Sequence, residues 1–90
     1  MIARRLSISG RVQGVGFRYA LADEARDRKL SGWVRNRRDG SVEAVIAGPE
    51  AGVEAVIAWA HQGPPAARVT AVTVEAATTD ARGFEVLPTG

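Results

Sequence analysis

The sequence has 90 residues, with 12 basic and 10 acidic side chains and 46% hydrophobic residues. This length and composition fit one compact domain and exclude a disordered or fibrous chain, because two domains could not each bury an adequate core. With no cysteine and one histidine, the chain has no disulfide scaffold, no thiolate nucleophile and no Cys or His metal cluster. We therefore expect neither redox chemistry nor transition-metal catalysis.

The sequence also indicates where the protein is located and whether it binds a membrane or a nucleic acid. The first ten residues carry arginines and serines where a signal peptide needs an apolar run, and no segment approaches the roughly 18 apolar residues of a membrane span. We expect a cytoplasmic protein that has no membrane partner. A net charge of +2 is weak evidence for a nucleic-acid partner, and none is expected.

The first half of the chain predicts a strand, a helix and a hairpin. Apolar and polar residues alternate over residues 6–12, which is typical of a half-buried strand. Apolar residues recur at helical spacing from Phe17 to about Arg28. A second strand is expected at 33–37, and Asp39-Gly40 favours a tight turn into a third strand at 42–46.

The second half predicts another helix and two strands. Pro49 opens a helix that should end at Gly63, and a strand follows at 69–74 with a break in its alternation near Thr70, which we interpret as a bulge. A short last strand is expected at 84–86. The order β-α-β-β-α-β predicts an α+β domain covering residues 1–90, with an antiparallel sheet and both helices on one face.

The segment between the first strand and the first helix carries the best candidate site. Gly14 and Gly16 allow successive backbone N–H groups to turn inward as an anion-binding nest, and the free N–H groups of the helix add to it. Arg18 in the first turn can hold two oxygens of the same anion. Spacing alone leaves open that the glycines only make a turn and that Arg18 is a surface residue.

Known nucleotide motifs do not match this loop. A Walker loop needs Gly-Lys-Ser/Thr, which is absent, and a dinucleotide fingerprint needs a third glycine where Tyr19 stands. The loop is therefore expected to hold a small anion.

Three longer segments extend the motif: GRVQGVGFR at 10–18, GWVRN at 32–36 and DGSVE at 39–43. Gly48-Pro49 and GPPAARV at 63–69 follow them. Together these segments closely resemble the acylphosphatase family, over nearly the whole chain from about Leu6 to Leu87. The resemblance implies a ferredoxin-like sandwich that hydrolyses the carboxyl–phosphate bond of acyl phosphates without metal or cofactor.

The resemblance also implies roles for particular residues. Asn36 would orient the attacking water. The phosphoryl group would be bound by the Arg18 side chain and by the backbone amides of Gly14, Val15, Gly16, Phe17 and Arg18. The implied partner is a small acyl phosphate, with inorganic phosphate as product or inhibitor, and the protein is expected to act as a monomer.

Two positions depart from the family pattern. Lys29 stands where the family usually has glycine before Leu30, which puts the end of the first helix in question. The chain ends Val-Leu-Pro-Thr-Gly at 86–90, in place of the family's common Arg-Tyr ending.

The side chains present agree with this chemistry. The candidate site offers a guanidinium, backbone amides and a carboxamide, but no evident general acid. An alkoxide leaving group needs a proton or a metal, whereas an acyl carboxylate, with a parent pKa near ~4, leaves as a stable anion. Asn36 cannot act as a base, so it is assigned to orient water, with a phosphate oxygen as the proton acceptor; its alternative role is to cap the Asp39-Gly40 hairpin.

Two functions of other classes remain open. A single-stranded RNA-binding module uses the same element order, but the expected central strands offer no aromatic side chain for base stacking. A non-catalytic anion-binding or interaction domain is the other alternative. The basic run Arg35, Arg37 and Arg38 beside Asn36 could draw an anionic substrate inward or simply be solvated.

Overall fold

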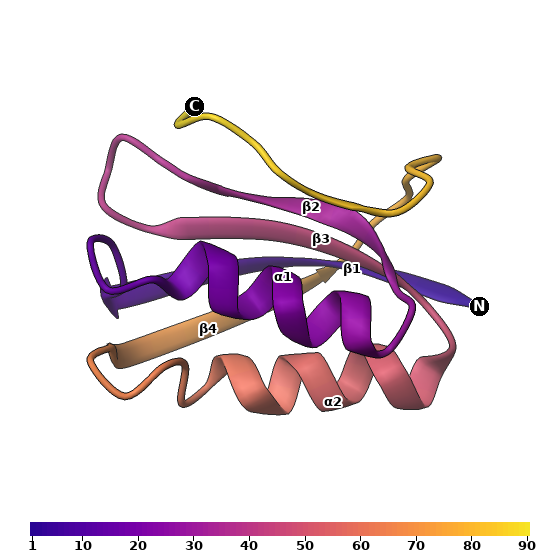
Figure 1. Ribbon diagram of the computed structural model, residues 1–90, viewed down its shortest axis with the longest axis horizontal. Helices are drawn as coiled ribbons and strands as arrows, with labels where there is room; N and C mark the ends of the chain where they lie inside the picture. Colours follow the sequence, from indigo (N-terminus) through magenta and orange to yellow (C-terminus); the bar gives the residue numbers. More distant parts are fainter.

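The computed structural model describes all residues from 1 to 90 and shows a twisted sheet with both helices on one face (Figure 1). This arrangement confirms the expected α+β class. The elements in chain order are β1 (Ile2–Arg11), α1 (Phe17–Asp27), β2 (Ser31–Asn36), β3 (Val42–Gly48), α2 (Glu50–Ala60), β4 (Arg68–Ala76) and β5 (Phe84–Val86).

The sheet has the strand order β4-β1-β3-β2-β5. Its four longer strands pair in antiparallel fashion, as expected, with β1 and β3 at the centre. The last strand, β5, pairs in parallel with β2, so the complete sheet is mixed and the expectation of a wholly antiparallel sheet does not extend to this edge. The parallel pairing arises because the connector after β4 crosses the sheet to the end where β2 begins. Two hydrogen bonds hold this connector, one from the Ala77 N–H to the Ala3 carbonyl and one from the Gly32 N–H to the Gly83 carbonyl.

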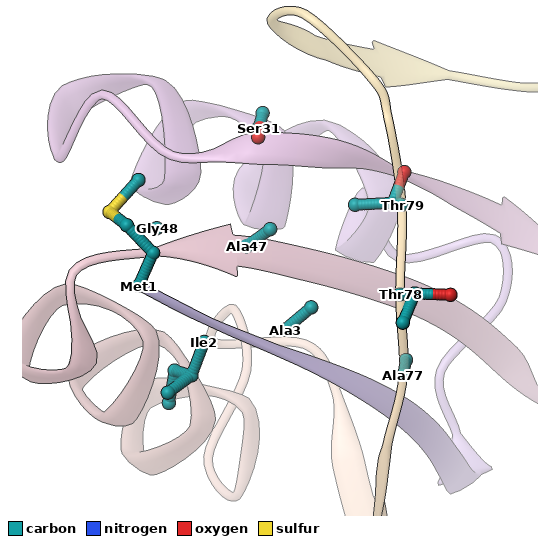
Figure 2. A pocket seen from close by; sticks show the side chains of 9 residues that line it. All are labelled: Met1, Ile2, Ala3, Ser31, Ala47, Gly48, Ala77, Thr78 and Thr79. Atoms are coloured by element: carbon teal, nitrogen blue, oxygen red, sulfur yellow. The ribbon is translucent and has the colours of Figure 1, made fainter.

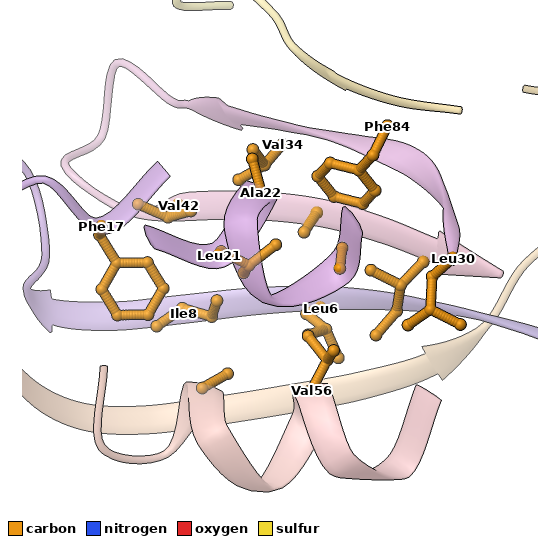
Figure 3. Close-up of a cluster of buried hydrophobic side chains, with 14 of the residues drawn as sticks. Leu6, Ile8, Phe17, Leu21, Ala22, Leu30, Val34, Val42, Val56 and Phe84 are labelled. Atoms are coloured by element: carbon orange, nitrogen blue, oxygen red, sulfur yellow. The ribbon is translucent and has the colours of Figure 1, made fainter. Parts of the chain in front are cut away.

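The hydrophobic core lies between the sheet and the two helices. Leu6 and Ile8 point from β1 toward the helices because alternate residues of a strand share a face. They join Leu21 and other side chains in one cluster of 16 buried residues (Figure 3). Phe17 contacts Trp59 with ring centroids 5.4 Å apart, which packs the start of α1 against α2. The first turn of α1 is thereby fixed to the core.

The element boundaries shift in ways that have local causes. β1 begins at Ile2, earlier than expected, because its first residues pair with the end of β3, from Ile2 opposite Gly48 onward. The break in β4 is confirmed as a bulge: Ser9 pairs with Ala71 and Gly10 pairs with Val69, which leaves Thr70 as the extra residue. Neither helix has the length and apolar content needed to cross a membrane.

Candidate active site

The loop between β1 and α1 turns through two left-handed glycines. Gly14 has φ 73° and Gly16 has φ 78°, and a Cβ at either position would meet no atom within 4 Å. Gly16 is the N-cap residue of α1, and no side chain caps the free N–H groups of the first turn. No acidic residue occupies that turn. The loop therefore presents backbone donors and the positive end of a helix dipole toward open space, an arrangement that suits a small anion.

Arg18 lies in the first turn of α1 and is half-buried. Its Cζ atom lies 5.5 Å from the centroid of the Tyr19 ring. The four ion pairs of the structure use Arg5, Arg28 and Arg35, so the charge of Arg18 is not matched by a carboxylate of the protein. A free guanidinium beside a set of uncapped amides can bind an anion.

Asn36 closes β2 and pairs with Val42 on β3. Only 9% of its surface is exposed, and its Oδ1 is the one buried side-chain polar atom in the structure without a hydrogen-bond partner. An unsatisfied buried acceptor of this kind is destabilising by about 1–3 kcal/mol, so it requires an explanation. The atom can accept a hydrogen bond from water or from a ligand.

The hairpin after Asn36 is capped by Asp39. Its Oδ1 accepts hydrogen bonds from the Ser41 N–H at 2.9 Å and from the Ser41 hydroxyl at 2.6 Å. These bonds, first the one from the hydroxyl, lower the pKa of Asp39 below its usual value. The capping alternative for Asn36 is therefore wrong, because Asp39 takes that role.

The structure brings the loop and the hairpin together at one end of the sheet (Figure 1). The contact is made by Gln13, whose Nε2 donates to the carbonyls of Arg37 at 2.7 Å and Ser41 at 2.9 Å. Gln13 is part of the motif at 10–18, but the motif by itself indicates no function for it. The available signal was its position, because it is the polar side chain directly before Gly14.

The basic run beside Asn36 does not act as one group. Arg35 donates from Nε to Glu43 at 2.8 Å, and its guanidinium lies 5.2 Å from the centroid of the Trp33 ring. Both contacts place Arg35 on the open face of the sheet. Only Arg37 and Arg38 remain as candidates for attracting an anion.

The outward residues of the two central strands do not suit base stacking. They include Arg5, Ser7 and Ser9 on β1 and Glu43 and Val45 on β3, and none is aromatic. The RNA-binding alternative therefore has no stacking platform on the central strands.

One open pocket of about 380 Å³ lies at the far end of β1 from the loop. Figure 2 shows Thr78 and Thr79, from the segment after β4, beside Ala3 and Ala47. None of its nine lining residues belongs to the loop at 14–18 or to the turn between β2 and β3. The candidate site is thus an open cradle of backbone groups and not this pocket.

The fold is that of a ferredoxin-like domain, and its first helix starts from a loop of left-handed glycines with uncapped backbone N–H groups. Residues 4–86 match the family model described as Acylphosphatase. The chain belongs to the acylphosphatase family.

Its relatives agree over almost the full length. It is 59% identical over 90 residues to an acylphosphatase of Azoarcus sp. (strain BH72), covering 99% of this chain and 92% of the relative. The crystal structure of acylphosphatase from Bacillus subtilis matches with a TM-score of 0.92 and 39% identity, covering 97% of this chain and 99% of that one. The structure of full-length HypF in its phosphate- and nucleotide-bound form matches 98% of this chain but only 12% of its own length, with 27% identity and a TM-score of 0.89. The protein is accordingly an acylphosphatase enzyme acting on acyl phosphates.

Proposed function

We propose that the loop at residues 14–18 binds the phosphoryl group of a small acyl phosphate and that Asn36 orients the water that attacks it. The backbone amides of Gly14, Val15, Gly16, Phe17 and Arg18, with the Arg18 guanidinium, surround the phosphoryl oxygens. The support for the binding role is the pair of left-handed glycines and the uncapped first turn of α1.

The observation that carries the proposal is the unpartnered Oδ1 of Asn36. In the proposed complex this oxygen accepts a hydrogen bond from the attacking water and thereby fixes the direction of the lone pair on the water oxygen. A carboxamide does not take up a proton at neutral pH, so Asn36 acts by orientation alone. Gly90 N–H donates to the Asn36 carbonyl at 3.0 Å, which helps to hold the end of β2 in place.

The reaction balances without a proton donor for the leaving group. The water oxygen forms a bond to phosphorus, and the bond between phosphorus and the acyl oxygen breaks, with its electron pair leaving on the carboxylate. The water proton passes to a phosphoryl oxygen of the substrate. Arg18 and the loop amides stabilise the charge on the phosphoryl oxygens in the transition state, and most of the catalysis is positioning and electrostatics.

The proposed enzyme works as a monomer, because the loop, Arg18 and Asn36 all come from one chain. Inorganic phosphate is proposed as its product and as a competitive inhibitor that occupies the same loop. Action in the cytoplasm stays a prediction of the sequence.

The test is phosphate release from benzoyl phosphate compared with an alkyl phosphomonoester, both measured in the presence of a strong chelator. We expect turnover of benzoyl phosphate, competitive inhibition by inorganic phosphate and little turnover of the monoester, because an alkoxide leaves poorly without a proton donor. Comparable turnover of the two substrates would contradict the proposal, as would loss of benzoyl phosphate hydrolysis on chelation.

A further inference from the structure

The side chain of Gln13 connects the anion-binding loop to the β2–β3 hairpin. Both hydrogens of its amide are donated to one partner segment, at 2.7 Å to the Arg37 carbonyl and at 2.9 Å to the Ser41 carbonyl. Gln13 is half-buried and directly precedes Gly14. The connection therefore begins where the loop begins.

The two carbonyls flank the position of Asn36. Arg37 follows Asn36 in the chain, and Ser41 precedes Val42, which pairs with Asn36 across the strands. The Gln13 amide thus binds the peptide groups next to Asn36 on both strands of the hairpin. A displacement of this amide would change the position of the loop relative to Asn36.

The hairpin closes without help from Gln13. Arg37 N–H donates to the Ser41 carbonyl at 2.8 Å, and Gly40 N–H donates to the Arg37 carbonyl at 3.1 Å. Each of the two acceptors therefore keeps a backbone donor when the Gln13 side chain is removed. The Gln13 side chain instead fixes the position of the loop relative to the β2–β3 hairpin.

We propose that Gln13 is a positioning residue that sets the distance between the loop and the Asn36 carboxamide. The inference rests on the roles proposed above for the loop and for Asn36. Phosphoryl transfer depends on the alignment of water with phosphorus, and a misplacement of about 1 Å can reduce a rate by up to ~10²-fold. Because both N–H groups of the Gln13 amide bind the hairpin, its loss should affect kcat and not the binding of phosphate.

The first experiment replaces the amide by a side chain of similar length that cannot donate. Gln13→Met should lower kcat for benzoyl phosphate by about 10-fold, while the inhibition constant for inorganic phosphate changes by less than about twofold. Gln62, the exposed glutamine after α2, provides the matched control, and Gln62→Met should leave both constants unchanged. Should Gln13→Met fail to fold, Gln13→Leu provides the same test, because its side chain is uncharged and cannot donate.

The second experiment is a double-mutant cycle with Asn36→Ala, which a merely structural role of Gln13 would not satisfy. If Gln13 acts through Asn36, Gln13→Met should change kcat by less than about twofold in the Asn36→Ala background. An equal loss of kcat in both backgrounds would overturn the inference, and so would an unchanged kcat in the single variant or a matching rise in the phosphate inhibition constant. Failure of the proposed function shows separately, as a normal kcat in Asn36→Ala alone.

Discussion

The backbone N–H of Leu30 donates a 2.9 Å hydrogen bond to the carbonyl of Ala25 and closes the end of α1 around Lys29. The N–H of Lys29 donates at 3.0 Å to the Arg26 carbonyl. These two bonds form a Schellman motif. The donor of the second bond, at the position of Lys29, is left-handed in this motif and is usually glycine. Lys29 has φ 56° and is the one non-glycine residue of the chain with a positive φ.

Lys29→Gly should therefore stabilise the protein. Removing the Cβ relieves the left-handed strain, and after the extra freedom that glycine gives the unfolded chain we expect a gain of about 0.5–1 kcal/mol in the free energy of unfolding. Thermal or urea unfolding measures it, with Lys29→Ala as the control that removes the charge but keeps the Cβ. Equal stabilities of the glycine and alanine variants would contradict this account of the helix end. The kcat should not change in either variant, because Lys29 lies at the opposite end of α1 from the loop.

Arg18→Ala should raise KM and lower kcat together, because the guanidinium contacts oxygens that carry charge in both the ground state and the transition state. Arg18→Lys should restore little activity, since an ammonium lacks the two-pronged geometry. The melting temperature should stay near that of the parent protein, because no ion pair is lost. Near-normal kcat/KM in Arg18→Lys would show that Arg18 is only a surface residue.

Gly14→Ala and Gly40→Ala form a matched pair for the loop. Both glycines have a positive φ, 73° and 95°, and a Cβ at either would meet no atom within 4 Å. Each substitution should destabilise the fold by roughly 1–2 kcal/mol through backbone strain alone. Only Gly14→Ala should raise the inhibition constant for inorganic phosphate, because only it reorients amides of the loop. Equal phosphate binding in the two folded variants would contradict the role of the nest.

The open face of the sheet predicts a pH dependence of stability that is separate from catalysis. Glu43, with 6% of its side chain exposed, accepts hydrogen bonds from Arg5 at 2.6 Å and Arg35 at 2.8 Å. Burial alone would raise the pKa of Glu43, but the hydrogen bonds from Arg35 and Arg5 outweigh it and lower the pKa below its ordinary value of 4.5.

A lowered native pKa means that Glu43 contributes its full stability above its unfolded pKa and that this contribution is lost as the pH falls from there through the lower native pKa. Glu43→Gln should reduce the free energy of unfolding at pH 7 by about 1–2 kcal/mol. The difference from the parent should shrink below pH 4.5, where the parent loses the same interaction. Glu54→Gln, on the exposed side of α2, is the control and should show no such dependence. A difference that stays constant with pH would contradict this reading of Glu43.

Much of the fold is predictable because its signals are local. The alternation around Leu6 and Ile8, the Asp39-Gly40 turn and the break at Thr70 each depend on a few neighbouring residues, and all three appear in the structure. The pairing of β5 with β2 depends on where the connector crosses the sheet, which no local pattern of residues 77–83 encodes.

The candidate site likewise has one part that the local sequence predicts and another part that it does not. The glycine loop and Arg18 are contiguous, so the sequence marks this segment as a candidate anion site, although its spacing alone also fits a plain turn. The bonds from Gln13 to the hairpin join positions 24 and 28 residues apart, and the buried, unpartnered state of the Asn36 oxygen depends on packing around the end of β2. The role of Gln13 therefore needed coordinates, whereas the role of Asn36 was already implied by the family resemblance and the structure adds that its oxygen is buried and unpartnered.

Whether Asn36 orients the attacking water can be measured from the kcat of Asn36→Ala, determined beside its inhibition constant for inorganic phosphate. We expect kcat for benzoyl phosphate to fall by about 10²-fold or more, while KM and phosphate inhibition change little, because the lost contact acts on the nucleophile. The variant should also be no less stable than the parent by thermal unfolding, since Oδ1 has no partner to lose. A near-parental kcat in the folded variant would contradict this role of Asn36.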